Sequence, residues 1–361
     1  MSTLLPGPMC SLFLADLGAD VIKVEYLSGD LMRGFETSNK DSAYFSSLNR
    51  NKKSIALNLK TDNGKKIFLK LAKQSDVIIE SFRPGKAESL GLGYECIKRT
   101  NPKIIYCSIT GYGRKGRYRD KAGHDINYSA LSGLLDVLSP KPFVPGLQIA
   151  DVGCAIIAAF SIASSLFYRE KTCKGNFIDI SIMDSALALI NIHIAQYSKT
   201  HNLKSILSGN MPCYNIYETK DKRFVSLGAI ESKFWQSFCN ATGKQDLLAR
   251  QFDEVAIGEL KTLFKSKTMV QWLNLNKKYD FCCEPVKNIG EVLSDIHLKS
   301  TNSLIKLNGV TQVAMPIFFS SFGKLKYQKS PKLGQNTREV LKLIGYKTKE
   351  IDNFYKEKIV G

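Results

Sequence analysis

The sequence lacks several patterns that would assign it to a class directly. It contains no Cys-x-x-Cys pair and no G-x-x-x-x-G-K-[ST] loop, which argues against a cysteine zinc site and against a P-loop nucleotide site. Its first eight residues do not place a basic stretch before an apolar one, so we expect no secretory signal. No apolar run approaches the roughly 20 residues that cross a bilayer. We therefore expect neither secretion nor membrane insertion.

The charge is strongly unbalanced. The chain of 361 residues carries 51 Lys and Arg against 33 Asp and Glu, a formal net charge of +18. Such a balance favours anionic partners: nucleic acid, an anionic membrane surface or a phosphorylated small molecule. The basic residues are scattered, however, and nucleic-acid binding requires them to cluster on one face. We expect a lysine-rich surface and no nucleic-acid partner.

The number and the placement of the cysteines indicate a reducing cellular compartment. The nine cysteines are odd in number, and several stand inside apolar runs, such as Cys107 after Ile105 and Tyr106. This pattern predicts reduced thiols in the cytoplasm and no disulfide framework. Cys154 stands close to a carboxylate in the sequence, but no histidine or basic residue stands beside it, so packing is the better interpretation of this thiol.

Apolar periodicity predicts an α/β protein. Short β-branched runs at residues 21–24, 54–59, 76–79, 104–109 and 177–181 alternate with helical patterns at 8–18, 63–73, 152–170 and 183–196. Strands that alternate with helices indicate a mostly parallel sheet. A polar linker at 199–213 separates this part from a strand pair at 214–228 and further helices. We predict a large domain of residues 1–198 completed by 325–361, and a small α/β domain of 214–324.

Two residues form a candidate acid/base pair. His124 is one of four histidines, and Asp151 comes just as the helix of residues 152–170 begins. Histidine titrates near neutral pH, so a histidine and a carboxylate can exchange protons with a substrate. Alternatively, His124 makes an ordinary structural hydrogen bond and Asp151 caps its helix. From these residues alone both interpretations stay open.

Several motifs in order resemble one family, the class III (CaiB/BaiF) CoA-transferases, and within it the alpha-methylacyl-CoA racemase branch. The matching stretches are residues 6–8, 14–25, 48–54, 82–85, 123–128, 150–151, 174–175 and 228–231. The resemblance implies a Rossmann-like large domain, a smaller α/β domain and subunits interlocked as a homodimer. It also implies an acyl-CoA substrate, with coenzyme A as part of that substrate and no other cofactor or metal.

The resemblance assigns roles to individual residues. In the racemase branch His124 and Asp151 are the two acid/base groups, and Glu231 orients the imidazole. In the transferase branch Asp151 is instead a nucleophile that takes the acyl group as an anhydride. The N–H of Asp151, at its helix start, is our candidate donor to an enolate oxygen. The residues implied to line the CoA and substrate site are Leu57, Asn58, Leu59, Lys60, Ser81, Phe82, Arg83, Gly123, Asp125, Ile126, Asn127 and Tyr128.

The sequence also differs from the family pattern. The family's first strand has no counterpart before Pro6, and Tyr26 and Ser89 stand where arginines that contact CoA are expected. The glycine-rich run after Asp151 is reduced to Gly153, and residues 209–212 resemble the transferase branch. Arg50, Lys53, Lys60 and Arg83 are candidates for contacting the phosphates of CoA. Alternatively, each is an ordinary exposed basic residue of a protein rich in them.

Overall fold

The computed structural model describes residues 1–35, 42–321, 323 and 325–361. It divides into a large unit, Met1–Ile192 with Asn302–Gly361, and a small unit, His193–Thr301. We predicted residues 302–324 in the small domain. The structure places the described residues of this range, 302–321 and 323, in the large unit, where the side-chain oxygen of Gln312 accepts a hydrogen bond from buried Arg50.

Parallel strands form the centre of the large unit. One sheet pairs β1 (Val21–Glu25) with β2 (Lys52–Ala56), and a second has the order β3 (Val77–Glu80), β4 (Ile105–Thr110), β5 (Asn176–Ser181). The predicted strand at 54–59 begins and ends earlier, because Asn58 forms a turn with Thr61 that starts the next helix. The hairpin of β9 (Leu304–Leu307) and β10 (Val310–Val313) is antiparallel.

Helices cover the sheets of this unit. They are α1 (Pro6–Asp16), η1 (Leu31–Arg33), α2 (Ala43–Asn49), α3 (Asp62–Lys73), α4 (Lys86–Ser89), α5 (Tyr94–Thr100), α6 (Asp125–Leu131), α7 (Leu134–Leu138), α8 (Ile149–Thr172), α9 (Ile182–Leu189), α16 (Thr337–Leu343) and α17 (Thr348–Lys356). The expected helix at 183–196 is divided between α9 and α10 (Asn191–Thr200), which begins where the units meet in sequence.

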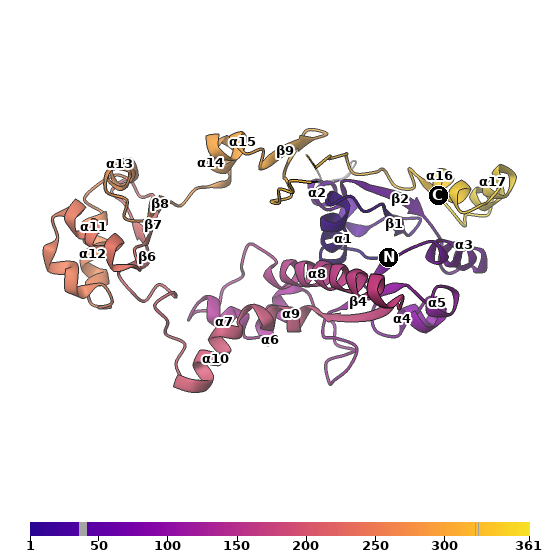
Figure 1. Ribbon diagram of the computed structural model, residues 1–361, viewed down its shortest axis with the longest axis horizontal. Coiled ribbons are helices and arrows are strands. Elements are labelled where there is room, and N and C mark those ends of the chain that lie inside the picture. The colour runs from indigo at the N-terminus through magenta and orange to yellow at the C-terminus, as the bar shows by residue number, and fades with distance from the viewer. Residues whose placement is uncertain (36–41, 322, 324) are drawn as a thin grey trace. The chain divides into compact units, whose positions relative to one another are not determined.

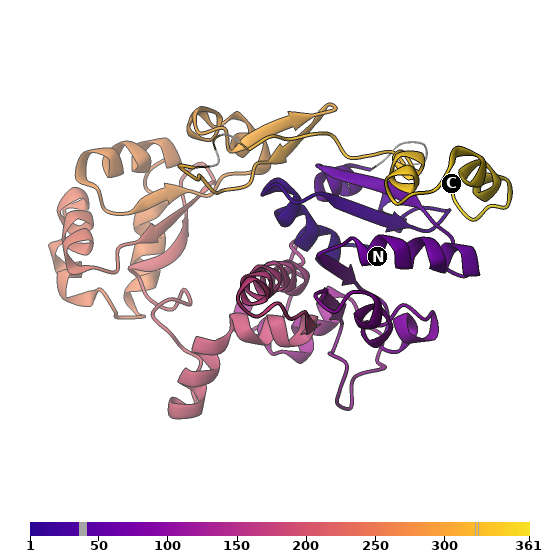
Figure 2. The ribbon, with the colours of Figure 1, turned by 45° about the vertical axis from the view of Figure 1, so that its right-hand side comes forward.

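Strand β4 contributes to two hydrophobic cores. Its Tyr106 packs with α3, α5 and the C-terminal helices, whereas Ile105 and Cys107 pack with α1, α8 and α9. All six residues of β4 are buried, as expected for a strand covered on both faces. The C-terminal helix α16 lies beside β2 (Figure 1, Figure 2). The prediction of an α/β unit with parallel strands is confirmed.

The expectation about apolar runs is wrong for one helix. α8 is long and apolar enough to cross a membrane, judged by length and composition alone. Its small residues, among them Ala155 and Ala158, are buried against α1 and α9. A helix buried in a protein core needs the same apolar composition as a helix that crosses a membrane. Its other face exposes Ile156, Phe160 and Phe167, with exposed fractions of 54%, 73% and 64%.

The small unit has its own sheet and core. Antiparallel strands β6 (Tyr214–Glu218), β7 (Phe224–Gly228) and β8 (Cys283–Pro285) pack against α11 (Ser232–Thr242), η2 (Gln245–Arg250), α12 (Ala256–Phe264) and α13 (Met269–Tyr279). Two further helices are α14 (Ile289–Ser294) and α15 (Ile296–Ser300). Both tryptophans of the chain, Trp235 and Trp272, are buried in this core.

Candidate active site

Asp151 lies in the first turn of α8 and is not its N-cap. The residue at the N-cap position is Gln148, whose side chain makes no capping hydrogen bond. The first N–H groups of a helix have no partner within it, so they need acceptors from elsewhere. The acceptor here is the Asp125 carboxylate, whose Oδ1 lies 2.9 Å from the backbone N of Asp151.

His124 is the N-cap residue of α6, and its side chain is exposed. Its backbone N–H donates to Oδ1 of Asn127 at 3.0 Å, so Asn127 stabilises the helix start. Tyr128 donates from its hydroxyl to the carbonyl of Gly123 at 2.6 Å. A Cβ at Gly123 would lie 2.6 Å from the Tyr112 hydroxyl, so the close packing of these two tyrosines requires glycine there. The residues of the 123–128 motif thus hold His124 at a fixed helix start.

The hydrogen bond between Asp125 and Asp151 corrects one expectation. We expected the N–H of Asp151 to donate to an enolate oxygen, but this N–H is already bonded to the Asp125 carboxylate. The reason is the missing N-cap, which leaves the start of α8 dependent on a side chain of α6. Asp125 was implied to line the substrate site, which stays a prediction; the structure shows that its carboxylate accepts a hydrogen bond from the start of α8.

Burial dominates the electrostatics of this centre. It raises the pKa of Asp151 to about 7, and the negative charge of Asp125 acts in the same direction. Burial likewise raises the pKa of Cys154 to about 12, which keeps this thiol neutral and unsuited to nucleophilic attack. Tyr128 also has its pKa raised to about 12 by burial, with Asp151 as the next contribution. Burial therefore brings the pKa of the Asp151 carboxyl close to neutral pH.

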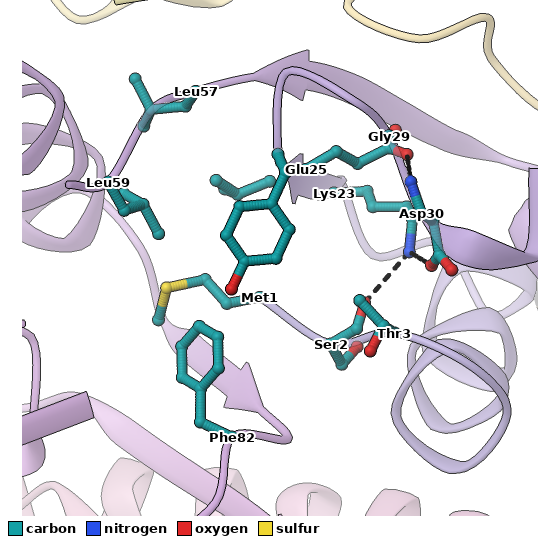
Figure 3. Close-up of a pocket in the computed structure, with 12 residues that line it drawn as sticks. Met1, Ser2, Thr3, Lys23, Glu25, Gly29, Asp30, Leu57, Leu59 and Phe82 are labelled. Atoms are coloured by element: carbon teal, nitrogen blue, oxygen red, sulfur yellow. Dashed lines mark hydrogen bonds and ion pairs between the residues drawn. The ribbon is translucent and has the colours of Figure 1, made fainter. Parts of the chain in front are cut away.

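A small hollow with a volume of about 20 Å³ lies at the carboxyl ends of β1, β2 and β3 (Figure 3). Three predicted residues line it: Leu57, Leu59 and Phe82. At its edge the Lys23 ammonium lies 2.6 Å from Asp30 and donates to the carbonyl of Ser2. Ligands of parallel α/β sheets bind at this end of the strands. Tyr26, which stands where a CoA-contacting arginine was expected, also lines the hollow. Sequence reasoning missed its neighbours Glu25, Gly29 and Asp30, although their position after a predicted strand could have identified them.

Four other predicted binding residues, Asn58, Lys60, Ser81 and Arg83, lie in the turns that follow β2 and β3. After β3, Ser81 accepts a hydrogen bond from the N–H of Thr3, and the N–H of Phe82 donates to buried Glu80 at 2.7 Å. This carboxylate holds the turn that presents Arg83, which is exposed. After β2, the side-chain oxygen of Asn58 accepts the N–H of Lys60 at 3.1 Å and leaves the Lys60 ammonium exposed.

The expectation that Arg50 is an exposed phosphate ligand is wrong. Its guanidinium is buried and lies 2.5 Å from Asp16 of α1. Lys52, which we did not single out, is also buried and donates to two backbone carbonyls and to Asn49. Burial lowers the pKa of Lys52 well below its usual value. Lys53 lies 3.1 Å from Asp20. Residues 49–53 therefore link α1, α2 and β2, and their basic side chains stabilise the fold through ion pairs and hydrogen bonds.

Glu231 belongs to the small unit, where it is exposed at the N-cap of α11, just after β7. Its side chain makes no capping hydrogen bond. Its proposed action on His124, which is in the large unit, stays a prediction. Among the described residues, no three His, Cys, Asp or Glu side chains are grouped to hold a metal ion.

Comparison with known proteins gives one family. The profile of CoA-transferase family III matches residues 1–337. The chain is 32% identical over 380 residues to alpha-methylacyl-CoA racemase from Homo sapiens, covering 100% of this chain and 95% of that one. It is 33% identical over 366 residues to succinyl-CoA:glutarate CoA-transferase from Mus musculus, covering 95% and 84%. The crystal structure of a CAIB/BAIF family protein from Brucella suis matches with a TM-score of 0.85 at 26% identity, covering 95% and 97%.

Proposed function

This chain belongs to CoA-transferase family III, an enzyme family that acts on acyl-CoA, and we propose that it is a racemase or epimerase. Its substrate in this proposal is a 2-methyl-branched acyl-CoA, whose α-carbon it inverts. The similarity to human alpha-methylacyl-CoA racemase over the whole chain supports this choice.

The observation that most directly supports this proposal is the environment of Asp151. With a pKa of about 7 its carboxyl is present in both protonation states near neutral pH. A general acid or base is most effective when its pKa lies near the working pH. A carboxylate that must attack a thioester needs to be ionised, so a raised pKa suits proton transfer better than nucleophilic attack.

The proposed reaction needs two groups of opposite protonation. The thioester carbonyl acidifies the neighbouring C–H, so one of His124 and Asp151, in its basic form, removes the α-proton. The electron pair of that C–H bond moves into the carbonyl and forms an enolate. The other group, in its acidic form, returns a proton to the opposite face, and the centre is inverted. Glu231 is assigned to orient the imidazole of His124.

The enolate oxygen requires donors that are not already bonded. Asp151 N–H is excluded by its bond to Asp125. The backbone N–H of Asp125 directly follows His124 at the start of α6, where the first N–H groups of a helix have no partner within it. We assign this N–H to the developing oxyanion.

For CoA recognition we propose the hollow at the strand ends together with Arg83. The half-buried side chain of Phe82, which lies beside the buried Leu57 and Leu59, offers apolar surface to a base or an acyl chain. The exposed guanidinium of Arg83 and the ammonium of Lys60 are suited to phosphate oxygens.

A CoA-transferase is the second candidate. The similarity to succinyl-CoA:glutarate CoA-transferase, at 33% identity, favours it. The Asp151 carboxylate would then attack the thioester, forming an acyl anhydride and releasing CoA as a thiolate. The thiolate attacks the Asp151 carbonyl of this anhydride and releases the donor acid. The acceptor carboxylate then displaces the thiolate from Asp151, and the thiolate attacks the acceptor's carbonyl to form the new thioester and free Asp151.

One assay separates the two candidates. The protein is incubated with a panel of 2-methyl-branched and unbranched acyl-CoAs in deuterium oxide, with and without free acids. We expect deuterium at the α-carbon of the branched substrates without an acceptor. CoA migration to an added acid, with a trapped adduct on Asp151 and no deuterium uptake, would refute the racemase proposal and support the transferase.

We further propose a homodimer, because α8 exposes apolar side chains on the face that does not enter the core. Phe160→Glu is expected to shift the protein from dimer to monomer in light scattering coupled to size exclusion. The control is Leu343→Glu on α16, an exposed leucine on a different helix. A wild-type monomer, or a dimer unaffected by Phe160→Glu, contradicts this interface.

A further inference from the structure

We infer that Asp125 is a positioning residue for Asp151: its carboxylate serves as the N-cap that α8 lacks and thereby fixes the backbone that carries the reacting carboxyl. This inference rests on the proposed function, because it assigns a role in the same proton transfer. It adds a residue that contacts Asp151 and acts through it.

The first argument is the helix start. Gln148 occupies the N-cap position of α8 without a capping hydrogen bond, and Asp151 is the acidic residue of the first turn. Asp125 accepts the Asp151 N–H at 2.9 Å from another helix, 26 positions away in sequence. The N–H of Ala150 also donates to this carboxylate. A carboxylate at a helix N-terminus is stabilised by both hydrogen bonds and the helix dipole. Without it, the turn that carries Asp151 has no side-chain cap.

The second argument is that Asp125 is itself held in place. It is the first residue of α6, whose start is fixed by the bond between the His124 N–H and Asn127. Tyr128, one turn later, is buried and bonded to Gly123. His124 precedes Asp125 directly in the chain. One short segment therefore carries the imidazole and also fixes the backbone of its carboxyl partner.

The third argument is charge. A second carboxylate at this distance opposes the ionisation of Asp151, and it adds to the larger effect of burial. The hydrogen bonds from the amides of Asp151 and Ala150 favour the ionised form of Asp125, which burial disfavours. Burial is the larger effect at Asp125 and raises its pKa as well, while at Asp151 burial and the Asp125 carboxylate act in the same direction and raise the pKa to about 7.

Other titratable groups could contribute to the same effect. The helices and strands packed against α8 are α1, α6, α9, β4 and β5. Together with α8 itself and the turn after β3, these elements carry, among other ionisable side chains, those of Cys10, Arg83, Cys107, His124, Asp125, Tyr128, Cys154, Asp179 and Asp184. Among these, Asp125 is the one whose charge raises the pKa of Asp151.

The test compares pH–rate profiles of α-proton exchange for the wild type, Asp125→Asn and Asp125→Ala, with Asp136→Asn on α7 as the matched control. In Asp125→Asn the side-chain oxygen of the amide still accepts the Asp151 N–H but carries no charge. We expect the inflection of Asp151 to move to lower pH, with kcat at the optimum within about 10-fold of wild type. Asp125→Ala, which removes the acceptor as well, is expected to lose more of kcat with KM little changed. Asp136→Asn should leave the profile unchanged.

Two results would overturn the inference. One is an Asp125→Asn profile that coincides with the wild type. The other is a raised KM with unchanged kcat in both variants, which would make Asp125 a substrate-binding residue. Asp125→Asn preserves the shape of the side chain and decides the question if Asp125→Ala does not fold. If the wild-type protein exchanges no α-proton, the proposed function itself is refuted. If the wild type exchanges the proton and Asp125→Asn has the same profile, only the role of Asp125 is refuted.

Discussion

Replacement of Asp151 by asparagine is expected to lower the rate of α-proton exchange by about 10²–10⁴-fold, the usual contribution of one general acid or base. The amide has the shape of the carboxyl but neither accepts nor returns the proton. The Asp151 N–H remains available to Asp125, so the start of α8 is preserved. Exchange is measured by mass spectrometry of the acyl-CoA in deuterium oxide.

The same substitution is expected to stabilise the protein at high pH. The folded state raises the pKa of Asp151 from 3.8 to about 7, so it retains a proton that the unfolded chain releases. Between about pH 4 and 7 the free energy of unfolding of the wild type therefore falls as pH rises. Asp151→Asn lacks this titration. By pH 8 its stability should exceed that of the wild type by up to about 4 kcal/mol, since one pKa unit is worth about 1.36 kcal/mol.

A matched variant controls both measurements. Asp136→Asn removes an exposed carboxylate from the same unit and should change neither the exchange rate nor the pH dependence of unfolding. If Asp151→Asn exchanged the α-proton at the wild-type rate, Asp151 would not be one of the two acid/base groups.

Replacement of Arg50 by leucine is expected to lower the free energy of unfolding by about 3–5 kcal/mol, because it leaves the buried carboxylate of Asp16 without its cation. The pair is 2.5 Å apart, and both side chains are almost fully buried. Arg50 also donates to Gln312 at 3.0 Å, so the loss extends to the β9–β10 hairpin. Hydrogen exchange of the β1 and β2 amides measures this unit, while tryptophan fluorescence reports the small unit.

The double variant Asp16→Ala, Arg50→Leu should recover part of that loss, because it buries neither charge. Lys53→Leu is the control: its pair with Asp20 is exposed and should be worth no more than about 1 kcal/mol. If Arg50→Leu were as stable as the wild type but bound CoA more weakly, the prediction would be wrong. Arg50 would then be a phosphate ligand.

The sequence predicted the strands of the large unit closely, because buried parallel strands are continuous β-branched runs. Residues 104–109 were expected and β4 is Ile105–Thr110. The division of the chain was predicted less well. The boundary near residue 301 depends on the contact of Gln312 with Arg50, which is far away in sequence. A local sequence pattern cannot predict such a contact.

The candidate site shows the same contrast. His124 and Asp151 could be chosen from residue type and motif order, since those belong to single segments. The role of Asp125 could not, because it depends on a hydrogen bond between two helices whose approach is set by tertiary packing. Arg50 was misjudged for a related reason: basic side chains are mostly exposed, and only the partner on α1 explains its burial.

The route of the chain through the large unit has a consequence for its synthesis on the ribosome. The N–H of Asn58 donates to Ile359 at 2.8 Å, and Val340, Leu341 and Ile351 share a core with Ile55 and Ile67. This core cannot close until the last segment has emerged, after the entire small unit has been translated. The nascent large unit therefore carries exposed apolar surface for most of its synthesis, which makes it a natural client for chaperones. The small unit, whose core uses its own residues alone, can fold first.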